Sequence, residues 1–254
     1  MHQYIVFLKK EFTEQVRTYK LLILVLVFLL LGVMNPLTAK LTPLLLSSLS
    51  AQGFAIDIPE VTAVSSWEQF FKNGSQMGVI AVLIVFCGLI SKEISKGTLL
   101  NMLTKGLSRR IVLLSKITVC CILYTAAYLL SFAVTAAGTA LFWNGEDVHH
   151  LFFSVFCLWL FGLLLLAAEV FGGALFGKTL GSLLFAGGFF VVLSIVGVIP
   201  QVSKYNPLTL TGGAQLVHGI NTPADVWPAV LIAGFLILAF FAGAIIVFRK
   251  TKIV

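Results

Sequence analysis

Charged residues are scarce in this chain. Asp, Glu, Lys and Arg together make up 11% of its 254 residues, whereas soluble domains carry about 25%. Hydrophobic residues make up 59%, and the mean hydropathy is +1.04. A soluble protein of this length cannot bury so much apolar surface in one core, because its outer surface must be in contact with water. The composition therefore excludes an ordinary soluble domain and predicts a membrane protein.

Cysteine and histidine are also sparse, with four of each. The cysteines (Cys87, Cys120, Cys121 and Cys157) lie inside or beside apolar runs, without the spacing of a disulfide framework or a zinc site. The histidines are scattered, and the pair His149–His150 is too small a cluster for a metal centre. We expect no metal site, and no cleavable signal peptide, because a mixed-charge stretch precedes the first apolar run.

Long apolar runs are what the sequence has in abundance. They cover residues 21–37, 70–91, 111–142, 151–176, 180–199 and 226–248. A helix needs about 20 residues to cross the hydrocarbon, and the short alternating segments of a membrane barrel are missing. We therefore expect an all-α membrane protein, with one transmembrane domain over residues 1–254 and six membrane-spanning helices.

Basic residues gather on one side of these predicted spans. They cluster in the first 20 residues, in the link between the second and third segments, at Lys178 and in the C-terminal tail. The opposite loops carry only Lys40, Lys72 and Lys204, together with most of the acids. By the positive-inside rule, both termini are cytoplasmic in a multi-pass protein, which we expect in a bacterial plasma membrane.

The segment "GGALFGKT", residues 172–179, matches the pattern of a phosphate-binding loop. Such a loop follows a β-strand and needs an acidic partner for Mg²⁺. Here it follows an apolar run that predicts a transmembrane helix, and Asp225, the one later acid, lies on the opposite side. We expect no nucleotide site and no enzymatic activity on this chain; the glycines instead let helices pack closely.

The N-terminal stretch 1–20 is amphipathic. Its apolar residues at helical spacing are Ile5, Leu8, Phe12, Val16 and Tyr19, while Lys9, Lys10, Glu14 and Arg17 occupy other faces. A basic amphipathic helix before a membrane span is expected to lie along the membrane surface. The alternative is a plain solvated helix.

Glu169 stands alone within the apolar run "LLLLAAEVFGG". An ionisable residue at such a depth indicates function or a buried pair. It would line the cargo path or pair with a base such as Arg109 or Lys116. Further on, residues 200–225 are rich in Pro and Gly and predict either short re-entrant helices or an ordinary outer loop.

The link between the second and third segments carries the most specific pattern. Leu99, Met102 and Leu103 share one helical face, which Lys96 and Lys105 flank. Such a short helix suits docking into a groove on another protein, or contact with anionic lipid. The wider pattern is Glu93-x-x-x-Gly97-Thr98-Leu99, then Leu103-Thr104, Ser108-Arg109 and Lys116.

This pattern resembles the signature of the type-2 ATP-binding-cassette (ABC) permease family, between the second and third of its six helices. "YNPLT", residues 205–209, is similar to the outer loop of that family. One departure is Lys105-Gly106-Leu107, where many members carry a proline before Ser-Arg. The likeness in layout covers essentially the whole chain.

The resemblance implies a half-transporter. Two permeases, a second copy or a relative, would pair and dock two cytoplasmic ABC ATPase subunits, which hold the ATP and Mg²⁺; this chain would need no cofactor and bind no nucleic acid. The region 92–110 would form the coupling helix and 1–20 the connecting helix. The implied site residues are Glu93, Lys96, Gly97, Thr98, Leu99, Met102, Leu103 and Lys105 for coupling, Phe12, Lys9, Lys10 and Arg17 for the interfacial helix, and Asn206 and Pro207 for the outer gate.

The sequence gives the least information about the cargo. Phe occupies 22 positions and charge is nearly absent from the spans, which suits export of an amphipathic or hydrophobic peptide, drug or lipid. Two alternatives are a stand-alone secondary transporter or channel, and a membrane-embedded enzyme. The first usually shows repeated halves and the second needs convergent catalytic side chains; we find neither in the sequence.

Overall fold

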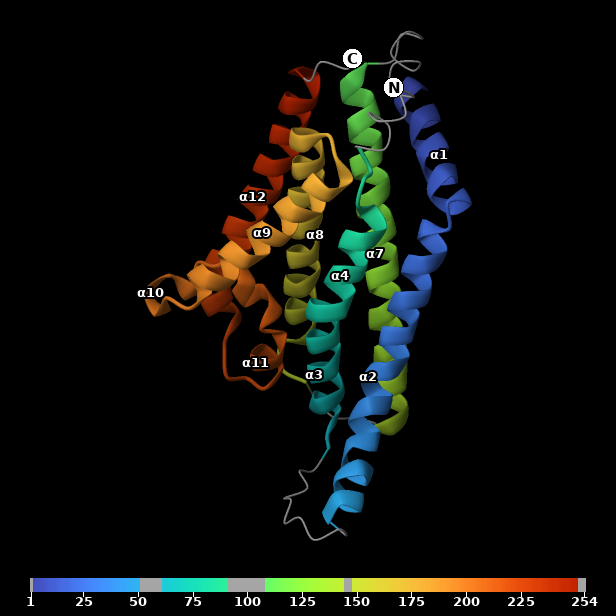
Figure 1. Ribbon diagram of the computed structural model, residues 1–254. Coiled ribbons are helices and arrows are strands. Elements are labelled where there is room, and N and C mark those ends of the chain that lie inside the picture. Colours follow the sequence, from blue (N-terminus) through green and yellow to red (C-terminus); the bar gives the residue numbers. More distant parts are fainter. Residues whose placement is uncertain (1, 51–60, 91–107, 144–147, 251–254) are drawn as a thin grey trace.

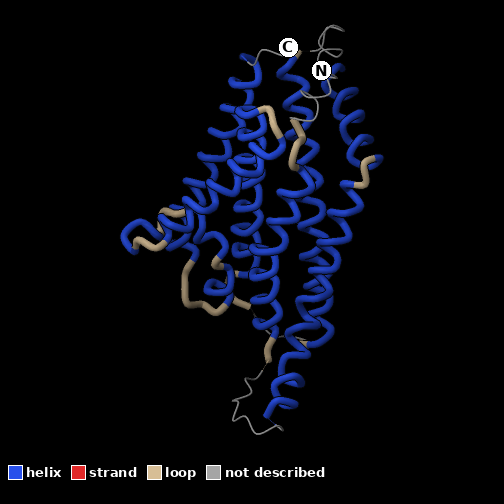
Figure 2. The backbone as a smooth tube through the Cα atoms, in the orientation of Figure 1, coloured by secondary structure: helices blue, strands red, loops and turns tan. Residues whose placement is uncertain are grey.

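The computed structural model describes residues 2–50, 61–90, 108–143 and 148–250. This part of the chain consists of helices and short connections (Figure 2), which confirms the predicted all-α class for the described residues. The elements are α1 (His2–Arg17), α2 (Lys20–Ser50), α3 (Ala63–Asn73), the π-helix η1 (Gly74–Gly78), α4 (Val79–Phe86), α7 (Arg109–Phe142), α8 (Leu151–Phe176), α9 (Thr179–Gly197), α10 (Pro200–Ser203), the 3₁₀-helix η2 (Pro207–Thr211), α11 (Gly213–Val217) and α12 (Pro223–Lys250).

Five helices in the described part are long and apolar enough to cross a membrane, namely α2, α7, α8, α9 and α12. The most buried of them, α8, lies in the middle of the bundle, with α9 and α12 on one side and α2 and α7 on the other (Figure 1). The apolar windows of α9 and α12 are only 17% and 22% buried. Apolar surface on this scale belongs against lipid rather than water.

The second apolar segment differs from the expected single helix over 70–91. Helical structure begins earlier, at Ala63, and the α-helical part ends at Phe86, with the π-turn Gly74–Gly78 between α3 and α4. Gly74 allows close packing there, because a Cβ atom at this position would lie 2.8 Å from Cδ2 of Leu158 on α8. The interruption leaves no long regular helix in this segment, so a count of six spans stays a prediction.

The first long helix also extends further than expected. The apolar run predicts a span over 21–37, whereas α2 continues to Ser50 through Pro36 and Pro43. Proline is tolerated in membrane helices because neighbouring groups satisfy the freed carbonyls. Gly138 accommodates one of these rings, since a Cβ atom there would lie 2.6 Å from Cγ of Pro36. The proline on α2 is therefore a packing contact with α7 rather than a helix end.

A chain of hydrogen-bonded polar side chains joins α2, α3 and α7. Asn73 donates from Nδ2 to Oδ1 of Asn35 (2.8 Å), and Asn35 donates from Nδ2 to Oγ1 of Thr135 (3.0 Å). Thr135 in turn donates to the carbonyl oxygen of Gly32 (3.1 Å). Hydrogen bonds between helices fix their register in an apolar surrounding, where no water competes.

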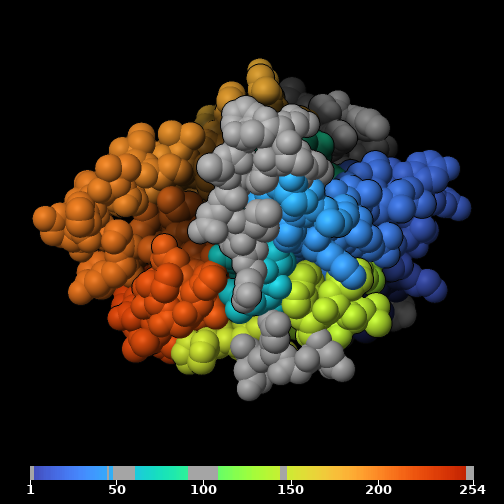
Figure 3. All heavy atoms as spheres, turned by 90° about the horizontal axis from the view of Figure 1, so that it is seen from below, coloured from blue at the N-terminus to red at the C-terminus, as the bar shows by residue number. Residues whose placement is uncertain are grey.

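The segment after α9 folds back against the bundle. α10 follows α9, while η2 and α11 pack against α8, and η2 also against α12. Leu210, Leu216 and Val217 are at most 1% exposed. Of the two expected forms, the structure therefore shows short packed helices and not an open loop. Seen from the end opposite the termini, α9 and this segment protrude on the side away from α1 and α2 (Figure 3).

Candidate functional site

The end of the bundle that holds both chain termini brings together several of the predicted basic segments. α1, the beginning of α7, the end of α12 and the turn between α8 and α9 all lie there (Figure 1). The predicted coupling residues from Glu93 to Lys105 lie outside the described residues. The described helices on either side of that segment, α4 and α7, therefore define the site.

The start of α7 is tied to the end of α12. Ser108 is the N-cap of α7, and its hydroxyl accepts a hydrogen bond from the amide of Ile111 (3.3 Å). Arg109 then donates from Nη1 to the carbonyl oxygens of Phe248 (3.5 Å) and Arg249 (3.3 Å). An arginine at this place satisfies carbonyls that the end of a helix leaves unpaired and complements the helix dipole. The Ser-Arg part of the sequence pattern thus acts as a clamp between two helices.

The start of α7 is also tied to α1, through a buried ion pair. Lys116 donates from Nζ to Oε2 of Glu11 at 2.7 Å, and the two side chains are 4% and 0% exposed. A second contact lies further towards the N-terminus, where the hydroxyls of Tyr4 and Thr118 are 2.8 Å apart. The sequence analysis did not single out Glu11. A signal was present, since an acid here shares the helical face of Phe7 and Gln15.

The face of α1 that packs against the bundle is not its apolar stripe. Phe7, Glu11 and Gln15 are the buried positions, at 5%, 0% and 4% exposure. The apolar residues Ile5, Phe12, Val16 and Tyr19 are instead exposed, as are Lys9 and Arg17. The helix therefore uses its polar face to bind the bundle and leaves its apolar stripe free, which fits a helix that lies in the membrane interface.

The charges on α1 continue outward from the buried pair. Lys10 donates to Oε1 of Glu11 (2.8 Å) and lies 2.6 Å from Oε2 of Glu14. Burial alone would raise the pKa of Glu14, but the hydrogen bond from Lys10 and the nearby lysine charges outweigh it and hold the pKa below its usual value. Glu14, Lys10, Glu11 and Lys116 thus form an alternating row of charges from solvent into the bundle.

Glu169 is buried in α8 at 2% exposure, and neither of its carboxylate oxygens accepts a hydrogen bond within the structure. No hydrogen bond joins Glu169 to the suggested partners Lys116 and Arg109 among the described residues, where Lys116 binds Glu11 and Arg109 binds the carbonyls of α12. The cavity beside the carboxyl group measures about 10 Å³, which has room for about one water molecule. No cargo path is open at this position in the conformation described. The cavity is lined by Phe86, Leu89, Ile90, Glu169, Val170, Gly173 and Ser182.

The predicted outer-gate residues lie in the packed segment after α9. Asn206 is 3% exposed and donates to the carbonyl oxygen of Leu193 on α9 (2.6 Å), while its Oδ1 accepts from the amide of Leu208 (2.9 Å). Pro207 follows as the first residue of η2 and is buried. Asn206 therefore caps η2 and attaches it to α9. It also lines a cavity of about 450 Å³ that presents both polar and apolar groups.

Comparison with known families decides what kind of protein this is. The model of the ABC-2 family transporter proteins matches residues 5–253, nearly the whole chain. The chain belongs to the ABC-2 transporter permease family. No significant match was found among curated proteins. The resemblance read from the sequence pattern is thereby confirmed. Together with the five apolar helices, the family makes this chain a multi-pass membrane permease subunit of an ABC transporter.

The family also explains the apparent phosphate loop. ABC-2 proteins are the membrane component of their transporters and normally work with an ABC ATPase. In this permease the GGALFGKT segment forms the end of α8, a turn and the start of α9. Gly177 is the left-handed C-cap of α8, at φ 62°, and donates to the carbonyl oxygen of Gly173. A helix, not a strand, precedes the turn, which is the wrong context for binding phosphate.

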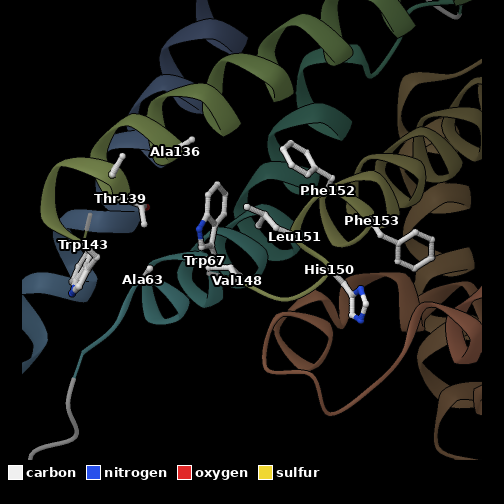
Figure 4. Close-up of a pocket in the computed structure, with 11 residues that line it drawn as sticks. Ala63, Trp67, Ala136, Thr139, Trp143, Val148, His150, Leu151, Phe152 and Phe153 are labelled. Atoms are coloured by element: carbon white, nitrogen blue, oxygen red, sulfur yellow. The ribbon is translucent and has the colours of Figure 1, made fainter. Parts of the chain in front are cut away.

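An aromatic cavity of about 430 Å³ lies at the end of the permease opposite the termini, between α3, α7 and α8 (Figure 4). Two of its polar groups have partners within the chain: Trp143 donates from Nε1 to the carbonyl oxygen of Val61 (2.8 Å), and Thr139 donates to that of Thr135 (2.7 Å). A cavity of this kind suits an apolar guest. It is lined by Ala63, Trp67, Ala136, Thr139, Ala140, Trp143, Val148, His150, Leu151, Phe152 and Phe153.

Proposed function

We propose that this permease is the membrane half of an ATP-driven exporter that moves an amphipathic or hydrophobic cargo outward. It would pair with a second permease, a copy or a relative, and with two cytoplasmic ABC ATPase subunits that bind ATP and Mg²⁺. The broken segment α3–η1–α4 would serve as the sixth span beside the five long helices. Residues 92–110 would include the coupling helix.

The observation that carries this proposal is the junction at the start of α7. This helix begins directly after the basic segment that carries the family pattern, and it is clamped to α12 by Arg109 and to α1 by Lys116. A push on that segment would reach three helices at once. Such an arrangement suits a motor that acts from outside the chain.

The nature of the cargo is proposed from the surfaces available. The aromatic cavity suits an apolar group, and the cavity beside Asn206, which presents both polar and apolar groups, lies in the same half of the bundle, at the ends of α9 and α12 away from the termini. An amphipathic molecule could bind its apolar part in the first cavity and its polar part in the second as it leaves the membrane. In this proposal the end with both termini faces the cytoplasm of a cell bounded by its plasma membrane, in agreement with the positive-inside rule.

The proposal is tested with the permease co-expressed with the ABC ATPase encoded beside it. Inside-out membrane vesicles are loaded externally with an amphipathic fluorescent dye, and uptake is followed after ATP addition. We expect ATP-dependent uptake that requires both proteins and stops when the catalytic glutamate of the ATPase is replaced by glutamine. Dye movement driven by the permease without the ATPase would instead support a stand-alone transporter.

A further inference from the structure

The short connection between α1 and α2 does not by itself fix the direction of α1. Only Thr18 and Tyr19 separate the two helices, and Tyr19 adopts a positive φ of 58°. This conformation is uncommon for a residue with a bulky side chain, and it turns the chain sharply. α1 therefore does not continue the axis of α2, and it packs mainly against α7. The direction of α1 therefore depends on its contacts with α7.

The strongest hold is the Glu11–Lys116 pair. Both charges are almost completely withdrawn from solvent, and each oxygen of Glu11 has one lysine partner, Lys116 on one and Lys10 on the other. Breaking a buried pair by removing one partner is costly, because the remaining charge stays buried without compensation. Separation of α1 from α7 would have the same cost, so the pair resists any motion of one helix without the other.

We propose that Glu11 and Lys116 are positioning residues that join α1 to the start of α7, so that the two move as one lever during transport. This inference rests on the proposed function, since the lever would be driven by an ATPase pressing on the segment before α7. The pair would transmit that force to the interfacial helix, and through it to the lipid-facing stripe of Ile5, Phe12 and Val16. Lys116, the last residue of the family pattern, thereby gains a physical role.

The test compares variants of the pair in the full complex. Glu11→Gln removes the carboxylate that pairs with Lys116, and Lys116→Gln removes one of the two lysine partners of Glu11. We expect the amount of dye moved per ATP hydrolysed to fall about fivefold or more, while ATP hydrolysis continues. Glu14→Gln is the matched control: it removes the exposed end of the same row of charges, at 42% side-chain exposure, and we expect it to transport normally.

A second variant separates coupling from folding. In the double variant Glu11→Lys/Lys116→Glu the two charges exchange places. We expect this double variant to recover the transport that the single variants Glu11→Gln and Lys116→Gln lose. Recovery by the exchange requires that the two side chains act on each other. Equal loss in all three variants, with normal folding, would overturn the proposal.

Distance measurements supply a readout that does not depend on activity. Spin labels are placed at Thr13 of α1 and at Ile122 of α7, both outside the core, after replacement of the four native cysteines. We expect the distance between the labels to be equal in the nucleotide-free and ATP-bound complexes, and to change between them in Glu11→Gln. A change in the unaltered pair would refute the lever. If the complex transports nothing in any form, the proposed function itself has failed.

Discussion

At the scale of single residues, Glu169 differs from Glu11, the other buried carboxylate among the described residues. Glu11 lies equally deep by exposure, yet it has a lysine on each carboxylate oxygen. Glu169 has no hydrogen-bond donor in the described structure and a cavity of single-water size beside it. An unsatisfied buried polar group is costly in any protein, so its presence here indicates a role that stability does not explain.

Replacing Glu169 with leucine is expected to stabilise the permease. Leucine is of similar size and removes the unsatisfied oxygens, for a gain of about 1–3 kcal/mol, measured as a higher midpoint of thermal unfolding in detergent. Glu169→Gln, the matched control, remains polar and should not gain this stability. If the carboxyl group serves transport, the leucine variant will be more stable and less active. A leucine variant that unfolds more easily would show that the carboxyl has a partner we have not seen.

At the scale of helices, the close packing of neighbouring helices depends on a few glycines. The structure distinguishes glycines that this packing requires from glycines that face open space. Gly162 of α8 faces Tyr124 of α7, and a Cβ atom there would lie 2.0 Å from the tyrosine hydroxyl oxygen. That hydroxyl donates to the carbonyl oxygen of Trp159 on the same turn of α8 (3.2 Å). Gly187 of α9 has no atom within 4 Å of the equivalent point.

The two glycines form a matched pair for mutation. Gly162→Ala is expected to force α7 and α8 apart and to cost about 1–3 kcal/mol. Gly187→Ala fills open space and should be neutral or gain up to about 1 kcal/mol from its higher helix propensity. Retention of folded protein on size-exclusion chromatography after heating measures both. Equal stability of the two variants would contradict the packing between α7 and α8.

The helices show how far the sequence alone could predict this fold. The expected bounds of α8 coincide with the structure, and those of α7 differ by two residues at the start, because these apolar runs end at clear signals such as Ser108-Arg109 and Gly177-Lys178. The start of α3 was missed because Glu68, Gln69 and Lys72 interrupt the hydropathy. The end of α2 was placed too early, at residue 37 instead of Ser50, because the apolar run stops there although the helix continues through Pro36 and Pro43.

The candidate site was less predictable, for a different reason. Periodicity tells which residues share a face of one helix, but not which helix that face will meet. The Glu11–Lys116 contact spans 105 residues, and nothing within either helix indicates the other. The sequence placed Lys116 in a family pattern without giving it a partner, and it gave no sign that the face of α1 opposite the apolar stripe packs against α7.

At the scale of the whole molecule, the two ends of the bundle differ in their charge. The end with both termini carries α1, the start of α7 and the end of α12, with their lysines and arginines, while Glu68 and Asp225 belong to elements at the other end (Figure 1). Such a difference between ends orients a membrane protein during insertion. It is also the feature of this chain that is most directly accessible to experiment.

The orientation is tested by labelling single cysteines in a variant without the four native ones. Lys178 lies in the turn between α8 and α9, Lys204 lies just after α10, and both are exposed. We expect a membrane-impermeant maleimide to label Lys204→Cys on intact cells and to label Lys178→Cys only after the membrane is opened. The reverse result would place the termini outside and remove the basis for a cytoplasmic ATPase.

The polar contact between Asn35 and Thr135 has a consequence for biosynthesis. The two residues are 100 positions apart, so Asn35 leaves the ribosome and enters the insertion machinery long before its partner exists. An amide has no stable place among acyl chains in the meantime. We therefore expect the first span to stay beside the translocon until α7 emerges. The pairing of these two helices, and not the insertion of each by itself, then becomes the step that commits the nascent chain to its final form.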